Sequence, residues 1–299
     1  MGFFKAAGEQ ITALSDALGF ERRDLKADIG MPWDFVRSSM LINTFKWDFP
    51  EIERYCMFVG YPRSGHTLVG SLLDAHPDVV ISHELDVLRY FRAGFGKERI
   101  FSLILHKDKE FTGRGREWTG YDYSVEGQWQ GKYRKLRVIG DKKGGGSSRH
   151  IQAKPDIIEN LRKELDLPLK FIHIVRHPLD NIATHYRKYS VGPTLQEAID
   201  DYFKRVEANA NLQTQLTENE WCEATHEEFV DDPKATITKL IEFLEVEPYP
   251  DFIEAAAAKV FKSPTNSRNK IEWPQEMIDQ VAERSQQYDF LKDYEFTVD

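Results

Sequence analysis

The run YPRSGHT (residues 61–67) decides the fold of this chain. It follows the apolar stretch 55–59 and precedes a helical apolar pattern at 68–73. A strand that enters a glycine-flanked loop and then a helix is the layout of a phosphate-binding loop, because successive backbone N–H groups and the positive end of the helix dipole point at one anion. The sequence therefore predicts an anion-binding loop between a strand and a helix.

One residue of this loop limits the kind of phosphate that it can bind. Counted from Gly60, the run matches G-x-x-x-x-G-K-[ST] except at His66, which stands in the place of lysine. In nucleoside-triphosphate sites that lysine reaches the β- and γ-phosphates, whereas a histidine of ordinary pKa is mostly neutral at pH 7. The guanidinium of Arg63 can instead fork onto an anion. We expect a nucleotide with a shorter anionic tail and no metal.

The composition is that of a globular protein with an acidic surface. The 299 residues are 41% hydrophobic and 30% charged, and no stretch approaches the length of a membrane span. The net charge of −9 argues against a general nucleic-acid binder. An acidic protein that binds an anionic ligand must concentrate its positive charge locally, so basic residues inside motifs carry most of the information.

The cysteines and the amino terminus predict a cytoplasmic location. Cys56 and Cys222 both lie in apolar, strand-like stretches and form neither a disulfide framework nor a zinc-binding spacing. The first residues, MGFFKAAGEQITAL, are interrupted by charge and lack a clear cleavage region, so they do not have the pattern of a signal peptide.

Strands alternate with helices along the chain. Strands are predicted at about 54–60, 79–81, 136–139, 169–175 and 220–225, and helices at 66–75, 85–91, 157–165, 195–206, 237–244 and 274–287. This alternation predicts an α/β fold with a P-loop-type central parallel β-sheet flanked by helices on both faces. One domain, 1–299, is the simplest organisation, with residues 1–50 as an N-terminal helical extension.

Residues 92–135 have a different composition from the segments on either side. They are rich in glycine, aromatic and charged residues, and one or two helical turns are predicted near 100–105. Long irregular segments in compact domains are usually lids or binding loops. We therefore predict that 92–135 forms a lid or acceptor-binding loop, although its aromatic side chains are equally suited to packing beneath a loop.

Cationic residues follow three of the predicted strands. They are Arg63, Lys142 with Lys143, and Arg176. In an open parallel sheet, ligands bind at the edge where strands end and helices begin. Convergence of these groups would form a site for a ligand with several anionic groups.

At these positions the chain resembles the sulfotransferases that use 3′-phosphoadenylyl sulfate (PAPS). Their first motif, YP[KR]SG[TS]T, is matched by residues 61–67. Their second motif is a strand that ends in Arg, followed by Pro, Asp and a Ser eight residues after the Arg. This chain has Arg176, Pro178, Asp180 and Thr184 at those places.

A longer stretch sharpens the resemblance. GHTLVGSLLDAHPDVVISHE (65–84) looks like the Golgi tyrosylprotein sulfotransferases and related bacterial enzymes, and Glu84 falls on their catalytic glutamate. GDK (140–142) is similar to a later strand end of the family, and SRNK (267–270) to its carboxy-terminal cofactor loop. The resemblance spans about residues 54–295.

The resemblance implies transfer of a sulfuryl group from PAPS to a hydroxyl, or less readily an amine, with 3′,5′-bisphosphoadenosine (PAP) as product and no metal. Glu84 would accept the hydroxyl proton, and we expect burial to raise its pKa toward that of an effective base. Arg63 and Lys142 would stabilise the charge on the leaving oxygen. The implied cofactor-binding residues are Arg63, Ser64, Gly65, His66, Thr67, Leu68, Arg176, Thr184, Ser267 and Arg268.

This chain departs from the family motifs at two positions, and alternative residue roles and functions remain open. His66 replaces a small hydroxyl residue, so either backbone amides hold the anion or a protonated His66 contacts it; Thr184 retains the hydroxyl of the serine that it replaces. His83 is the rival to Glu84 as base. A P-loop kinase and a non-catalytic nucleotide-binding protein are the alternative functions. The acceptor is expected to be a small hydroxylated molecule, and neither its identity nor the oligomeric state follows from the sequence.

Overall fold

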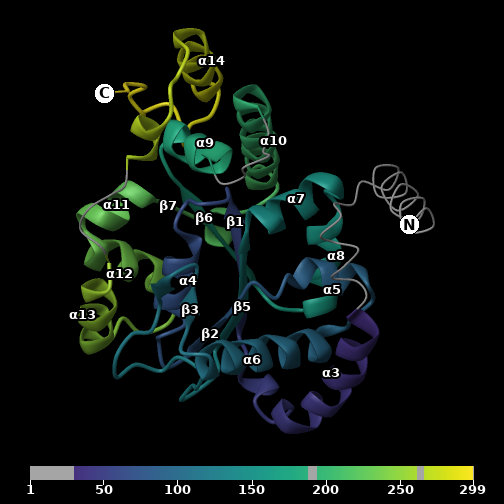
Figure 1. Cartoon of the computed structure of the whole chain (residues 1–299). Helices are drawn as coiled ribbons and strands as arrows, with labels where there is room; N and C mark the ends of the chain where they lie inside the picture. Colours follow the sequence, from purple (N-terminus) through teal and green to yellow (C-terminus); the bar gives the residue numbers. More distant parts are fainter. Residues whose placement is uncertain (1–29, 188–193, 261–265, 299) are drawn as a thin grey trace, which may run out of the picture.

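The computed structural model describes residues 30–187, 194–260 and 266–298. Its centre is a parallel sheet whose strands lie in the order β2-β5-β1-β6-β7 (Figure 1). The strands are β1 (Arg54–Gly60), β2 (Val79–His83), β5 (Val138–Gly144), β6 (Leu169–Val175) and β7 (Trp221–Thr225). Every neighbouring pair in this sheet is parallel, with Cys56 opposite Gly140 on one side and Lys170 on the other. The predicted α/β fold class is confirmed.

Both faces of the sheet are buried beneath helices, as a parallel sheet requires. Side chains alternate along β1, so that Tyr55 and Met57 pack into one core cluster while Cys56 and Phe58 pack into another. The first cluster includes α3 (Met31–Phe45), α5 (Val87–Arg92), α6 (Lys97–Gly113), α7 (Gly145–Ala153) and α8 (Ile157–Leu165). The second includes α4 (His66–Leu73), α11 (His226–Asp231), α12 (Pro233–Phe243) and α13 (Pro250–Ala258).

A third apolar cluster lies at the ends of β1 and β6. It joins Tyr61 and Val175 to α9 (Pro178–Arg187), α10 (Leu195–Gln213) and α14 (Gln275–Ser285). Single turns of 3₁₀-helix occur at η1 (Phe49–Glu51), η2 (Glu218–Glu220) and η3 (Ser267–Lys270). The remaining strands, β3 (Glu117–Trp118) and β4 (Tyr121–Asp122), form a small antiparallel hairpin.

The structure corrects the prediction for 92–135. Residues 97–113 form the 17-residue helix α6, rather than an irregular segment with one or two turns. Its buried face includes Ile100, Leu103 and Ile104, and charged residues elsewhere on the helix hide that pattern in the sequence. Of the predicted N-terminal helical extension, 31–45 is helical and 1–29 lie outside the described residues.

A second correction concerns β5, which continues to Gly144 instead of ending near residue 139. Asp141 and Lys142 therefore belong to the strand, and both are buried. Charged side chains usually end a buried strand, but each of these finds a polar partner in the site described below. None of the helices in the described part of the chain is long and apolar enough to cross a membrane.

Candidate active site

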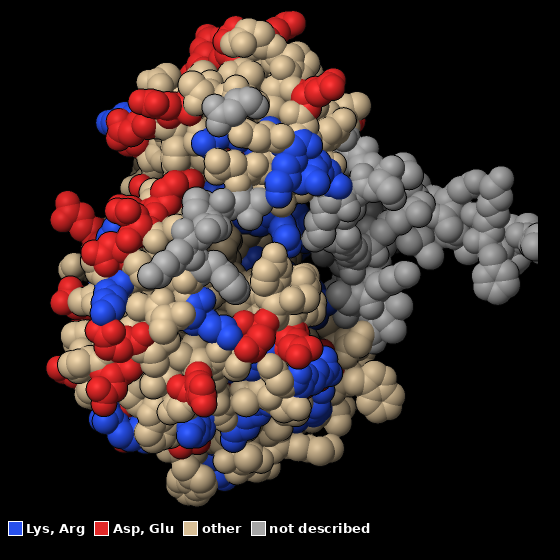
Figure 2. All heavy atoms as spheres, turned by 60° about the vertical axis from the view of Figure 1, so that its left-hand side comes forward, with Lys and Arg blue, Asp and Glu red and all other residues tan. Residues whose placement is uncertain are grey.

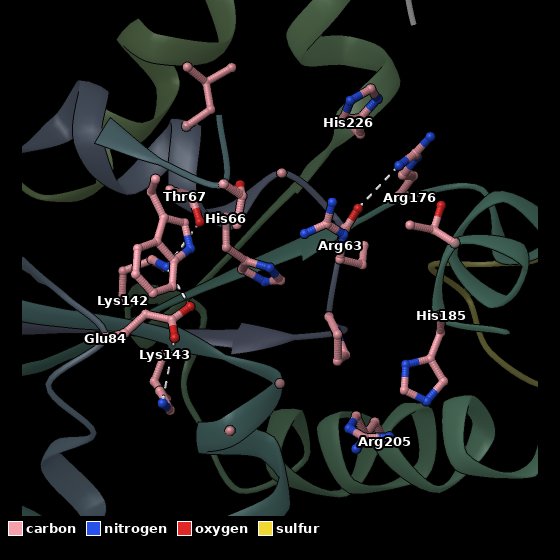
Figure 3. Close-up of a pocket in the computed structure, with 18 of the residues that line it drawn as sticks. Arg63, His66, Thr67, Glu84, Lys142, Lys143, Arg176, His185, Arg205 and His226 are labelled. Carbon is pink, nitrogen blue, oxygen red and sulfur yellow. Dashed lines mark hydrogen bonds and ion pairs between the residues drawn. The ribbon is translucent and has the colours of Figure 1, made fainter. Parts of the chain in front are cut away.

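A cavity of about 840 Å³ lies at the carboxyl ends of the central strands (Figure 3). Its wall includes Arg63 after β1, Glu84 after β2, Lys142 in β5 and Arg176 after β6. The three cationic groups predicted at separate strand ends therefore line one cavity, as expected for neighbouring tips of a parallel sheet.

The cavity is strongly basic although the protein is acidic. Among the described residues, its lining contains seven Lys and Arg side chains and two carboxylates. The basic residues are Arg63, Arg89, Lys142, Lys143, Arg149, Arg176 and Arg205, and the acidic ones are Glu84 and Asp86. Figure 2 shows Lys and Arg side chains around a hollow in this face of the molecule. Positive charge is thus concentrated where an anionic ligand would bind.

The loop after β1 presents backbone N–H groups to this cavity. Gly65, with φ of 92°, lets the chain turn into α4, and no side chain caps the first turn of that helix. Thr67 and Leu68 line the cavity within that turn. Ser64, predicted to bind the cofactor, does not line the cavity; its buried hydroxyl accepts a hydrogen bond from Asn181 Nδ2 (2.6 Å), which joins the loop to α9. An uncapped helix start is suited to holding an anion.

His66 is turned toward the sheet, where its ring is buried. Its Nε2 lies 3.0 Å from the carbonyl oxygen of Val59, so this nitrogen carries the proton that is donated. Burial lowers the pKa of His66 to about 3, although the bond to Val59 acts in the opposite direction. The ring is therefore uncharged at neutral pH. Of the two alternatives, contact with the anion through backbone amides remains.

The glycines of GDKKGGG allow β5 to pack against the loop. A Cβ on Gly144, where φ is 57°, would lie 3.0 Å from the His66 ring, and one on Gly145 would lie 2.7 Å from Pro62. Gly60 is equally restricted, since its Cβ would lie 2.7 Å from His66 Nε2. The large residue at position 66 is thus accommodated by glycines on both neighbouring segments.

Lys142 joins the loop to the predicted base. Its Nζ donates to Thr67 Oγ1 and to Glu84 Oε1, each at 3.0 Å. The lysine side chain is 3% exposed, whereas that of Glu84 is 36% exposed. Lys142 does not pair with neighbouring Asp141, because adjacent side chains in a strand point to opposite faces.

The expectation that burial raises the pKa of Glu84 is wrong. Burial acts in that direction, but the charges of Lys142 and Lys143 and the hydrogen bond from Lys142 outweigh it and lower the pKa of Glu84 to about 2. Lys143 Nζ lies 3.6 Å from Glu84 Oε2. Glu84 is therefore ionised at neutral pH and tightly paired.

Asp141 holds the turn that carries Glu84. Its buried carboxylate accepts the N–H groups of Leu85 (3.0 Å), Asp86 (2.8 Å) and Val87 (3.1 Å), as well as the hydroxyl of Ser82 (2.8 Å). The turn is tight, since φ is 56° at Glu84 and 71° at Asp86. Left-handed conformations cost non-glycine residues about 1–2 kcal/mol each. Asp141 offsets that cost with four hydrogen bonds.

His83, the rival base, belongs to an aromatic stack. Its ring lies parallel to that of Phe111, with centroids 4.4 Å apart, and edge-on to Trp118 at 4.9 Å. Burial, with the positive charge of Lys142 next in size, lowers the pKa of His83 to about 3. His83 is not among the residues that line the cavity. The position of His83 in this aromatic stack, outside the lining, favours Glu84 over His83 as the base.

Some of the predicted phosphate-binding residues line the cavity, and one of them, Arg268, does not. Arg176 and Thr184 line the cavity, as does Ser267. Arg176 Nη1 donates to the carbonyl oxygen of Arg63 (3.1 Å), which links the two strand ends. Arg268 is instead tied to Asp180, through its backbone N–H at 2.7 Å and its Nη1 at 3.2 Å, and it is not part of the lining.

Several lining residues were not identified from the sequence. Arg89 on α5, Arg149 on α7, Arg205 on α10, His185 on α9 and His226 on α11 come from elements far apart in the chain. His226 had one sequence signal, because it directly follows a strand that ends at the same edge of the sheet. The others depend on how the covering helices pack.

Within the described residues, no three His, Cys, Asp or Glu side chains are grouped in a way that could hold a metal ion. The described lining thus combines two carboxylates, Glu84 and Asp86, with seven basic side chains and the start of α4.

Comparisons with known proteins identify the family. A family model described as the sulfotransferase family matches residues 57–251. This chain belongs to the sulfotransferase family. A search of curated protein sequences gave no significant match.

Solved structures with a similar fold include other sulfotransferases. A sulfotransferase domain of the Synechococcus PCC 7002 olefin synthase is 16% identical, with a TM-score of 0.47, and the match covers 76% of this chain and 82% of that one. A sulfotransferase from Alicyclobacillus acidocaldarius is 15% identical, with a TM-score of 0.45 and coverage of 80% and 96%. A mouse sulfotransferase complexed with PAP is 14% identical, with a TM-score of 0.46 and coverage of 86% and 94%.

Proposed function

We propose that this protein transfers the sulfuryl group of PAPS to a hydroxyl acceptor and releases PAP. The observation that carries the proposal is the position of Lys142, which bonds both Glu84 and Thr67 at the wall of a cavity that also contains Arg63 and Arg176. A base, a cation and an anion-binding loop are thus in direct contact. That is the set of groups that an in-line displacement at sulfur requires.

The lining residues suit a nucleotide with phosphate groups at two positions. The N–H groups at the start of α4, together with Arg63, would hold the 5′-phosphate, since an uncapped helix start and a guanidinium both favour anions. Arg176 and Thr184 would hold the 3′-phosphate, with Ser267 nearby in the lining. His226, beside Gly65, lies where it would contact the nucleoside.

The chemistry follows from the positions of Glu84 and Lys142. The donor supplies the sulfuryl group, whose bond to the 5′-phosphate oxygen breaks as the hydroxyl oxygen of the acceptor bonds to sulfur. Glu84 takes the hydroxyl proton, and Lys142 stabilises the negative charge that grows on the departing oxygen. Preorganised charge of this kind usually contributes more to catalysis than any other single effect.

The low pKa of Glu84 fits this scheme if the ammonium of Lys142 pairs first with Glu84 and then with the leaving oxygen. In the structure Lys142 is the main positive charge that lowers the pKa of Glu84. As negative charge forms on the leaving oxygen, the ammonium of Lys142 turns toward it and away from Glu84. The basicity of Glu84 then rises at the moment when the hydroxyl proton must be removed.

The test of this proposal is Glu84→Gln. Turnover of radiolabelled PAPS should fall by about 10²–10⁴-fold, the usual contribution of a general base. Calorimetric binding of PAP should be nearly unchanged, because the amide oxygen can still accept from Lys142 and the donor contacts remain. Near wild-type turnover would remove Glu84 from its role. Loss of PAP binding in a folded variant would place Glu84 in the donor site instead.

The remaining expectations are part of the same proposal. The described residues form one five-stranded sheet with its covering helices and a small hairpin, which supports a single domain. The hairpin β3–β4 would form the acceptor wall, because Trp118, Tyr121 and Tyr123 line the cavity. Both cysteines are free and buried, which suits a reducing cytoplasm. The acceptor would be a small hydroxylated molecule.

A further inference from the structure

The cavity contains more basic side chains than the donor requires. With Arg63, Lys142 and Arg176 assigned to the donor under the proposed function, Arg89, Lys143, Arg149 and Arg205 remain. Arg205 is neutralised by Asp201, with which it forms an ion pair. The other three come from α5, β5 and α7 and line the same cavity as Glu84.

One of these side chains, Lys143, lies next to the predicted base. Lys143 Nζ is 3.6 Å from Glu84 Oε2 and 3.9 Å from Asp86 Oδ2. Arg89 lies one helical turn beyond Asp86, on the short helix that follows the Glu84 turn. An acceptor whose hydroxyl reaches Glu84 would therefore have neighbouring atoms near Lys143, and Arg89 lines the same cavity.

Arg89 has unused hydrogen-bonding capacity. Its Nε is buried, and no partner accepts from it among the described residues. Its guanidinium lies over the Tyr90 ring, 4.8 Å from the centroid, which fixes the plane of the group. The nearest carboxylate on its own helix, Asp86, lies 3.0 Å from His150 Nε2. A buried N–H without an acceptor is unfavourable unless a ligand supplies one.

Part of the cavity wall is aromatic. Trp118 and Tyr121, from the hairpin β3–β4, are 45% and 52% exposed and line the cavity. Trp118 is held close to Glu84 because it packs edge-on against His83, the residue before the base. Exposed aromatic rings beside a polar group are suited to a ring that carries polar substituents.

We infer that the acceptor is a ring compound that carries an anionic group near its hydroxyl, and that Arg89 and Lys143 bind this group. A carboxylate has the planar geometry that an arginine fork recognises. The ring would lie against Trp118 while the hydroxyl points at Glu84. This inference rests on the proposed function and specifies the acceptor of the same site.

The test compares acceptors that differ only in one charge. The probes are salicylate and glucuronate, each beside its methyl ester, with radiolabelled PAPS as donor. In the wild-type protein, kcat/KM should be about tenfold to a hundredfold higher for the acid of at least one pair, which is the usual value of a hydrogen bond between charged groups. Arg89→Gln should remove that preference, and Arg89→Lys should restore part of it.

A matched control is Arg92→Gln, which removes the same charge from the same helix. Arg92 Nη1 lies 3.2 Å from His150 Nδ1, and Arg92 is not part of the cavity lining. This variant should keep the preference for the acid. If Arg92→Gln and Arg89→Gln lower the preference equally, the effect is one of overall charge, and the assignment to Arg89 is overturned.

A binding measurement covers the case in which none of the probes is turned over. Saturation-transfer NMR on the PAP-saturated protein should then show tighter binding of an acid than of its ester, and Arg89→Gln should abolish the difference. Equal binding of acids and esters, or no binding of any acid, overturns the inference. Failure of the wild-type protein to bind PAP would overturn the proposed function instead, so the two failures are distinguishable.

Discussion

Lys142 Nζ lies 3.0 Å from Glu84 Oε1, and this contact joins the tips of two adjacent strands, β5 and β2. The same ammonium lies 3.0 Å from Thr67 Oγ1 on the anion-binding loop. One buried cation therefore controls both the charge of the proposed base and the position of the loop. Its removal should alter both, and the two effects can be measured separately.

Lys142→Met should raise the pKa of Glu84 from about 2 toward its ordinary value, because Lys142 is the main positive charge that lowers it. A raised pKa means that Glu84 is protonated at higher pH, so the acidic limb of kcat/KM should move upward into the range of about pH 4–5. Turnover should also fall by about 10²–10³-fold, as for other lost electrostatic contacts. An acidic limb at the wild-type position would contradict the pairing.

Arg176→Ala should weaken binding of PAP by about tenfold to a hundredfold, since one contact to a charged group is lost. Binding of AMP, which lacks the 3′-phosphate, should change much less. Isothermal calorimetry with both ligands checks this, and Arg187→Ala on α9, outside the lining, is the control. Equal losses for PAP and AMP would show that Arg176 does not bind the 3′-phosphate.

Asp141→Asn should disturb the Glu84 turn without touching substrate. The amide NH₂ would face backbone N–H groups that now donate to a carboxylate, so we expect a loss of about 1–3 kcal/mol in the free energy of unfolding. At a temperature where the variant is folded, kcat should fall while binding of PAP stays close to that of the wild type. A variant that lost only stability, with kcat unchanged, would show that Asp141 does not position Glu84.

His66→Gln should make stability less dependent on pH. Burial holds the pKa of His66 at about 3 in the folded state, below its ordinary value of 6.5, so the unfolded state binds more protons between these values. Stability therefore falls as pH drops through this window, by about 2 kcal/mol between pH 7 and pH 5 for one such group. Urea unfolding of both proteins at the two pH values should show a smaller loss in the variant. Equal losses would mean that His66 is protonated normally when folded.

Transfer of the sulfuryl group should survive EDTA, because the proposed charge stabilisation comes from Lys142, Arg63 and backbone N–H groups. Assays with radiolabelled PAPS before and after exhaustive chelation, followed by addition of Mg²⁺, check this. A strict requirement for Mg²⁺ would revive the kinase alternative, in which the metal neutralises phosphate charge.

The fold was predictable because the spacing of apolar residues along strands and helices shows directly which side chains are buried. The strand ends with Arg63, Lys142 and Arg176 were found in this way, whereas the carboxylate Glu84 was identified by its place in a family motif. The partners of these residues were not predictable. Asp141 acts on backbone N–H groups more than 50 positions earlier in the chain, and nothing in its neighbouring sequence indicates them.

Side-chain direction was the other property that the sequence did not reveal. His66 turns to the sheet because glycines at 60 and 144 leave room for its ring. Arg268, which is predicted to bind the phosphate, donates a hydrogen bond to Asp180. In both cases a neighbour that is distant in sequence decides which way the residue faces.

The adjacent charged residues Asp141 and Lys142 in β5 have a consequence for how this chain tolerates change. Because side chains alternate in a strand, Asp141 contacts the turn that carries Glu84 while Lys142 contacts the anion-binding loop. A single-residue insertion or deletion before them in β5 would exchange their sides and place each charge against the wrong neighbour. Length variation near this strand should therefore be confined to the segments beyond either end. A one-residue shift of Asp141 and Lys142 within β5 should abolish activity even where the sheet still forms.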